Sequence, residues 1–239
     1  MPIQIDFQKY YPDQASLFKK TWPKLKSFIK TFADEKFRNK KNQTGTIKKL
    51  INVIKTSEGD HEDAAVLKIL TYFLKITGLK ATLSKSGSNK KRKFNQDSSD
   101  DESSEEAKTA PATYSPKDIE KSFIVHVDCA EKIDRELQRK INEALKKKIT
   151  LQPYILIVGT PTVKLSSYVV VDDIKYATKS VIEALDLTFK IFFVSDSEYP
   201  TLSHHIWLFL QIAVYGIDEE KNVGTVIRNM IQSFKHHKV

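Results

Sequence analysis

A long polar stretch near the middle of the chain limits what this sequence can fold into. Residues 86–118 are rich in Ser, Asp, Glu and Lys and contain almost no aliphatic side chains. Such a stretch cannot bury enough apolar surface to offset the entropy lost on ordering, so it predicts a disordered linker. The chain has enough apolar residues for one ordinary domain, or for two small domains that each have a core. We therefore expect a basic helical domain over residues 1–85 and a second domain over residues 119–239.

The first segment has the apolar spacing of a small helical bundle. A first helix is expected after Pro12, and Pro23 should end it, because proline inside a helix removes a backbone hydrogen bond. Apolar residues then recur at offsets of three and four, which predicts a second helix immediately afterwards. Two more helices are expected to begin near Thr46 and Asp60, and Gly78 suits the end of the last one.

The second segment alternates between β-branched runs and amphipathic helices. Gly159, Thr160 and Pro161 supply turn chemistry between two apolar runs that read as paired strands. The order β-α-β-β-α-α-α predicts an α+β domain, in which helices cover a small β-sheet. In chain order, the predicted elements are strand 122–128, helix 130–148, strands 154–158 and 167–171, and helices 181–194, 203–215 and 223–234.

The positive charge is concentrated before the linker. Residues 1–85 carry 17 Lys and Arg against 8 Asp and Glu, whereas residues 119–239 carry 16 against 15. The lysines of the first domain are therefore candidate contacts to nucleic-acid phosphates, namely Lys24, Lys26, Lys30, Lys40, Lys41, Lys48 and Lys49. The alternative is an ordinary solvated face of a helical bundle. Sequence-specific DNA recognition is not expected, because arginine is scarce here and no recognition helix or zinc finger is evident.

The linker carries two charged motifs. Lys90, Lys91, Arg92 and Lys93 form a compact basic run of the kind that nuclear-import adaptors bind. Three serines follow, each three residues before an acidic residue, which is a spacing that acid-directed kinases favour; they are Ser98, Ser99 and Ser103. The motifs predict nuclear localisation that phosphorylation regulates. The alternative is a solvated charge run with no function.

No complete catalytic motif is present. The segment from Gly159 to Lys164 follows a strand but lacks the second glycine and the Lys-Ser/Thr pair of a phosphate-binding loop. Cys129 is close to His126 in sequence, but nothing indicates an oxyanion site, so a buried structural thiol is expected. A single cysteine excludes a disulfide framework. We expect no catalytic residue, no cofactor and no metal.

One acidic set supports an alternative function, that of an enzyme with a nuclease or transposase site acting on nucleic acid. Its members are Asp172, Asp173, Glu183, Asp186, Asp196 and Glu198. Converging carboxylates can hold metal ions for phosphodiester chemistry. Adjacent strand residues point to opposite faces, however, so turn and surface roles explain these acids more simply. Their clustering, or its absence, in the folded chain discriminates between the two interpretations.

The second half of the chain resembles a family of uncharacterised animal proteins that are linked to mobile elements. Some of them are labelled sterile-alpha-motif-domain-containing protein 3-like. The residues that carry the resemblance are Leu151–Gly159, Tyr168–Asp172, Ala184–Lys190, Phe192–Val194, Tyr199-Pro200, Trp207–Gln211 and Val214–Ile217, with Tyr11-Pro12, Leu17-Phe18 and Trp22-Pro23 in the first segment. The resemblance implies a shared fold and a mobile-element origin, and it supplies no catalytic residues.

Together with the resemblance, which implies the mobile-element origin, these observations predict a non-enzymatic nuclear interaction protein of mobile-element origin. The alternative is a degenerate or accessory mobile-element enzyme acting on nucleic acid. The basic domain would contact nucleic acid non-specifically, and the nearly neutral second domain would bind a protein partner or a second copy of the chain. The longest apolar run, Ile206–Ile217, is shorter than the roughly 20 residues that span a bilayer, so no membrane contact is expected.

Overall fold

The computed structural model of this chain describes residues 2–39, 41, 43–74, 114–217 and 223–238. Several predictions concern residues outside these ranges, namely those for the basic run Lys90–Lys93, for Ser98, Ser99 and Ser103, for Lys40 and for Gly78. They stay predictions.

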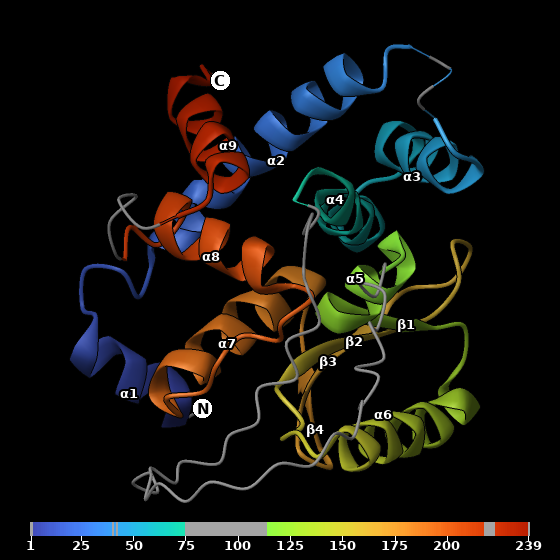
Figure 1. Cartoon of the computed structure of the whole chain (residues 1–239), viewed down its shortest axis with the longest axis vertical. Helices are drawn as coiled ribbons and strands as arrows, with labels where there is room; N and C mark the ends of the chain where they lie inside the picture. The colour runs from blue at the N-terminus through green and yellow to red at the C-terminus, as the bar shows by residue number, and fades with distance from the viewer. Residues whose placement is uncertain (1, 40, 42, 75–113, 218–222, 239) are drawn as a thin grey trace, which may run out of the picture. The chain divides into compact units, whose positions relative to one another are not determined.

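The second segment contains a four-stranded mixed sheet (Figure 1). Its strands lie in the order β1 (Ile124–Val127), β2 (Tyr154–Val158), β3 (Ser166–Val171) and β4 (Ile174–Thr178). The first two strands run parallel, because helix α6 (Ile133–Lys147) carries the chain from one to the other. The other neighbours pair antiparallel. A sheet accompanied by helices confirms the predicted α+β fold class.

The two faces of the sheet enter different apolar clusters. Ile155, Ile157 and Val169 belong to the cluster that contains helix α7 (Val181–Val194). Leu156 and Val170, which alternate with them, belong to the cluster that contains side chains of α6. The continuous apolar run of β2 therefore reflects burial on both faces, as is typical of central strands.

Two elements of the second segment were not predicted. Helix α5 (Pro116–Phe123) precedes β1 and begins with a capping box, in which Ser115 and Asp118 each accept a hydrogen bond from the backbone of the other. Strand β4 follows β3 through a two-residue turn. The predicted helices near the C-terminus are confirmed, with shifts of one or two residues, as α8 (His204–Ala213) and α9 (Thr225–His236).

The first segment is helical, but its first helices differ from those predicted. Its elements are α1 (Pro2–Tyr10), α2 (Leu17–Lys36), α3 (Gly45–Thr56) and α4 (Asp60–Phe73). The predicted break at Pro23 is wrong, since α2 continues through it. Pro23 is exposed, and it costs the helix one hydrogen bond. Burial of several α2 side chains, Trp22 and Leu25 among them, offsets that loss.

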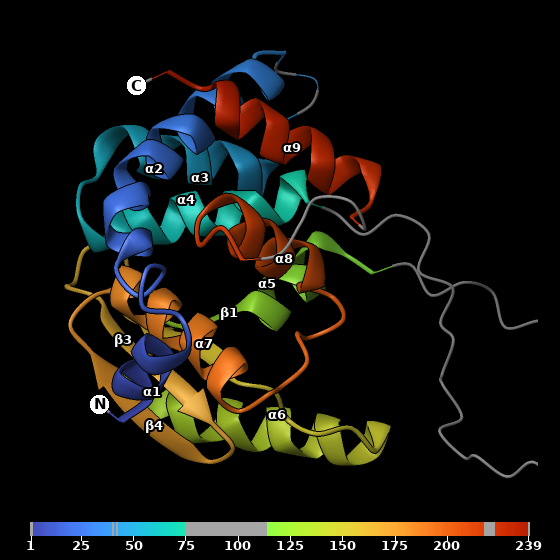
Figure 2. The same ribbon diagram turned by 90° about the vertical axis from the view of Figure 1, so that its left-hand side faces the viewer.

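The two segments do not form separate cores, which corrects the expected division between residues 1–85 and 119–239. The described residues of both segments belong to one compact unit, and the larger of the two apolar clusters contains side chains from both segments. Helix α1 lies against α7 (Figure 2), and the Phe7 ring of α1 has no exposed surface. Helix α4 is buried on nearly every side, so it needs partners from both segments.

Candidate functional site

Two of the predicted phosphate-binding lysines are engaged within the protein. The Lys26 ammonium lies 2.5 Å from a Glu62 carboxylate oxygen and 2.8 Å from Asp63, and the Lys30 ammonium lies 2.7 Å from Glu62. Burial alone would lower the pKa of Lys26, but the hydrogen bonds and charges of the two carboxylates raise it. The cluster joins α2 to α4, and its positive charge is largely neutralised.

The other predicted lysines differ in their surroundings. Lys24 is half-buried, and its ammonium lies 5.2 Å from the centre of the Phe234 ring of α9. Lys41, Lys48 and Lys49 are exposed. The predicted set is thus divided between α2, where the charges are engaged, and the neighbourhood of α3.

The outward side of α3 keeps its positive charge accessible. Lys48, Asn52 and Lys55 are exposed and share one helix face at offsets of four and three, with Lys49 beside them. The helix contains no acidic residue. Lys55 lies 3.0 Å from Asp34, but both side chains are 58% exposed, and such pairs contribute little. We call this surface the α3 cationic face.

Asn52 and Lys55 were missed as candidate contacts, although the sequence carried a signal for them. The helical spacing from Lys48 to Asn52 and Lys55 is visible in the sequence. Within this helix, the prediction covered only the adjacent pair Lys48 and Lys49. The N-terminus of α3, where Thr44 accepts a hydrogen bond from the Ile47 amide, adds partial positive charge at the same end as Lys48.

The acidic residues of the alternative enzyme have separate structural roles. Asp172 and Asp173 form the exposed turn between β3 and β4, where Asp172 adopts a left-handed backbone with φ 55°. Asp186 is buried in a hydrogen-bonded ion pair, and Glu198 is exposed in a loop. Among the described residues, no three His, Cys, Asp or Glu side chains are placed to hold a metal ion. Among the described residues, these acids therefore do not form the converging carboxylate set that metal-assisted phosphodiester chemistry needs.

The remaining sequence candidates are also structural. Cys129 is half-buried rather than buried, and its contact with Glu131 raises the pKa of the thiol. Gly159 has φ 137°, and a Cβ atom there would lie 3.0 Å from the Leu165 side chain. The glycine therefore permits the tight path of the chain as it leaves β2.

A polar cluster that the sequence did not suggest joins α4 to the parallel strands. His126 of β1 donates from Nε2 to the Gly159 carbonyl at 2.8 Å, so its Nδ1 atom accepts from the Lys68 ammonium at 2.5 Å. Lys68 also lies 3.7 Å from Glu120 of α5. The pKa of His126 is lowered mainly by desolvation and next by the positive charge of Lys68. The negative charge of Asp128 opposes this shift, and His61 adds to it.

This cluster predicts a loss of stability in acid. The folded protein favours neutral His126, so the unfolded chain binds the proton more readily, and the free energy of unfolding should fall as pH drops below about 6.5. Denaturant unfolding between pH 8 and 5 measures the fall, which His126→Asn should reduce. A proton NMR titration of His126 that gives a pKa at or above the ordinary histidine value contradicts the assignment.

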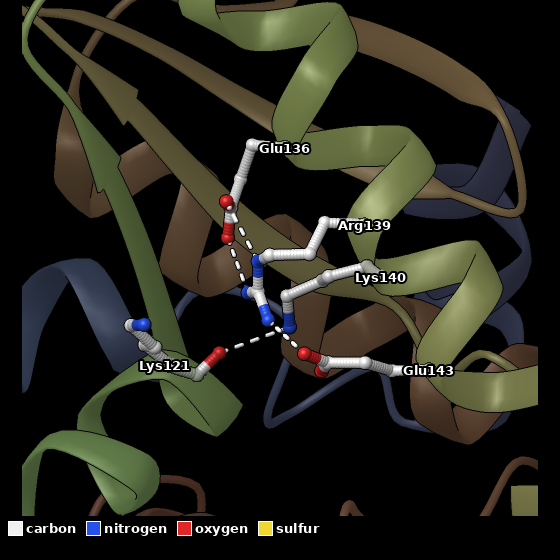
Figure 3. A network of polar contacts seen from close by, with 5 residues as sticks. All are labelled: Lys121, Glu136, Arg139, Lys140 and Glu143. Carbon is white, nitrogen blue, oxygen red and sulfur yellow. Dashed lines mark hydrogen bonds and ion pairs between the residues drawn. The ribbon is translucent and has the colours of Figure 1, made fainter. Parts of the chain in front are cut away.

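A second polar network holds α6 in place (Figure 3). Arg139 binds Glu136 through two nitrogens and also contacts Glu143. Lys140 donates to the Lys121 carbonyl at 2.9 Å, and its ammonium lies 4.2 Å from the centre of the Tyr154 ring. Burial and the neighbouring Arg139 charge lower the pKa of Lys140 to about 8. These contacts tie α6 to α5 and β2, and we assign them a structural role.

A small cavity of about 230 Å³ lies at the start of α7. Its acidic and hydroxyl groups are already engaged in helix caps or in a buried ion pair. Ser180 accepts from the Glu183 amide, and the Glu183 carboxylate accepts from the Lys179 amide. Asp186 is held by Lys190 and Tyr215. The cavity therefore presents no set of acidic or hydroxyl groups free to act on a substrate.

Comparison of the chain with protein families, with curated proteins and with solved structures found no match. The resemblance to mobile-element-linked proteins stays a prediction. Within the part of the chain that the structure describes, no helix is both long and apolar enough to cross a bilayer. Of the surfaces described above, the α3 cationic face is the one whose chemistry points to a ligand.

Proposed function

We propose that this chain is a non-enzymatic interaction protein that contacts the phosphate backbone of nucleic acid through the α3 cationic face. The observation that carries the proposal is the accessibility of Lys48 and Lys49 on a helix without acidic residues. Lysine ammonium groups bind phosphates as point charges, so the contact would be independent of sequence. The nuclear location that the basic run Lys90–Lys93 suggests is part of the same proposal.

The proposed contact has a defined salt dependence. Each lysine that neutralises a phosphate releases a counterion, so the affinity falls as salt rises. Contacts from Lys48, Lys49 and Lys55 would give a slope of about −2.7 in log affinity against log salt, which is a roughly 40-fold loss between 50 and 200 mM salt. Asn52 can donate a hydrogen bond to phosphate but adds nothing to this slope.

Charge reversal on α3 tests the proposal. In the full chain, Lys48→Glu combined with Lys49→Glu should abolish most binding to a fluorescent DNA duplex in 50 mM salt. For any residual binding, the slope of log affinity against log salt should be no steeper than about −0.9. Fluorescence anisotropy across a salt series measures both quantities.

The matched control is Lys19→Glu combined with Lys20→Glu. These lysines are also adjacent and exposed, they lie on α2, and their reversal changes the net charge by the same amount. This control should keep most of the wild-type affinity. Equal losses in the two double variants would show a response to net charge alone, and retained binding in the α3 variant would exclude the α3 cationic face as the contact.

A further inference from the structure

Strand β4 lies at one edge of the sheet, and side chains on both of its faces are exposed. Among the residues that the structure describes, β4 pairs with β3 alone, and its first four residues are exposed. Two of them are large and apolar, with Ile174 54% and Tyr176 38% exposed. By contrast, three of the four residues of β1, at the other edge, are buried. An accessible edge strand is a template for pairing with another strand.

The register shows which backbone groups of β4 are free to pair. Val171 and Ile174 flank a two-residue turn. They must form a hydrogen-bonded pair, in which the amide of each donates to the carbonyl of the other. If they formed a pair without hydrogen bonds, the next pair, Asp172 with Asp173, would have to be hydrogen-bonded, and these two residues are adjacent in the chain. Hydrogen-bonded pairs alternate along the ladder, so Tyr176 also bonds inward to β3. The amides and carbonyls of Lys175 and Ala177 therefore point away from the sheet.

This outward pattern is complementary to itself in an antiparallel arrangement. If Tyr176 of one copy lies opposite Tyr176 of another, Lys175 falls opposite Ala177, and these two residues can exchange both of their outward hydrogen bonds. The same register brings Ile174 opposite Thr178. The exposed Ile174 and Tyr176 side chains would then lie on one face of the joint and cover each other.

The residues on either side of β4 carry opposite charges, which would also pair between the two copies. In the same register Asp173, in the turn before β4, falls opposite Lys179, which follows the strand. Both residues are exposed, and neither forms an ion pair with another described residue. Two-fold symmetry creates this opposite-charge pair twice, once at each end of the joint. Lys175 faces Ala177 rather than its own copy, and it is already 3.3 Å from Asp134 of α6.

We propose that two copies of this chain associate by antiparallel pairing of β4 with β4 about a two-fold axis at Tyr176. The two four-stranded sheets then form one continuous sheet. The proposal is independent of the nucleic-acid contact, because β4 and the α3 cationic face share no residue.

A proline substitution tests the backbone contact. Ala177→Pro removes an outward amide without removing a hydrogen bond to β3, since Ala177 bonds only outward. It should weaken dimerisation of the full chain by at least about tenfold, because each dimer loses two hydrogen bonds. The matched control, Ala177→Val, keeps the amide and should dimerise like the wild type. Analytical ultracentrifugation over a concentration series measures the association.

Cysteine crosslinking tests the register. In a Cys129→Ser background, Tyr176→Cys places two thiols opposite each other at the axis, in a pair without mutual hydrogen bonds, where Cα atoms lie about 4.5 Å apart and a disulfide can form. Mild oxidation should convert most of this variant to a covalent dimer. Ile174→Cys is the control, because its two copies lie four residues apart along the joint, too far for a disulfide.

The outcomes separate the proposal from its alternatives. A wild-type chain that stays at the 27.4 kDa monomer mass up to about 1 mM contradicts it. So does a dimer that Ala177→Pro leaves intact while its fold, checked by circular dichroism, is retained. Faster crosslinking at position 174 than at position 176 would overturn the register.

Discussion

Replacement of Asp186 by asparagine is expected to lower the free energy of unfolding by about 3–5 kcal/mol. Asp186 and Lys190 of α7 are 2% and 5% exposed, and the Lys190 ammonium lies 2.8 Å from the Asp186 carboxylate. Lys190 also donates to the Ala15 carbonyl at 3.0 Å, and Tyr215 donates to the carboxylate at 2.8 Å. Asparagine keeps the shape but leaves the ammonium buried without a counter-ion.

The chain contains a closely matched control for this substitution. Asp128 and Lys132 are the same residue types at the same spacing, with their charged atoms 2.7 Å apart, but the side chains are 71% and 43% exposed. Asp128→Asn should therefore change stability only slightly, because solvent screens the pair. Urea unfolding followed by tryptophan fluorescence compares the two variants.

Removal of both charges provides a second check. The double variant Asp186→Leu with Lys190→Met leaves no buried charge unpaired, so it should be more stable than Asp186→Asn alone. Burial raises the pKa of Tyr215, so its hydroxyl stays protonated and, in the double variant, loses only its acceptor. A double variant no more stable than the single one, or an Asp186→Asn effect as small as that of Asp128→Asn, would contradict the role assigned to the pair.

Periodicity within a short run of residues predicted those helices and strands that can be recognised without their neighbours in the fold. The runs 154–158 and 181–194 agree with β2 and α7 because each is buried as a whole and is bounded by turn or cap residues. Strand β4 was missed for the opposite reason. Its alternation of apolar and polar residues covers only Ile174, Lys175 and Tyr176, so the sequence signal for a strand is short and weak. Four of its five residues are exposed, so burial does not mark it as a strand either. Pairing with β3 holds it in place instead.

Ion pairs between residues that are distant in the sequence determine which lysines can contact a ligand. Lys26 meets Glu62 from 36 positions away, which no spacing rule reveals, so the predicted phosphate-binding set included a residue that is neutralised within the fold. Asp186 was expected to have a turn or surface role, whereas its side chain is buried. Its partner Lys190 stood four residues along the same helix, and this signal could have indicated a buried pair.

The sequence also carried a signal for the apolar cluster that the two segments share. The helix that begins at Asp60 is apolar around most of its circumference, which is typical of a helix buried on all sides. A bundle confined to residues 1–85 offers too few partners to cover it. The polar composition of residues 86–118 suggested two domains, but composition alone does not tell whether the segments that it separates pack together.

A test of the shared core is the truncation of Phe7, which should lower the free energy of unfolding by about 3–5 kcal/mol. The ring is fully buried, and its centre lies 6.3 Å from Phe189, 6.1 Å from Phe193 and 6.3 Å from Tyr215, all in the second segment. Phe7→Ala leaves a cavity among these rings, because rings on α7 and on the segment that follows α8 cannot all move to fill it.

The control lies on the same helix, since Ile5 of α1 is 59% exposed. Ile5→Ala makes a change of the same kind without opening a buried cavity, and it should alter stability by less than about 0.5 kcal/mol. If the two segments folded separately, Phe7→Ala would leave the unfolding of the second segment unchanged. Hydrogen exchange at the amides of α7 distinguishes the cases, because only a shared core makes protection of that helix depend on a residue of α1.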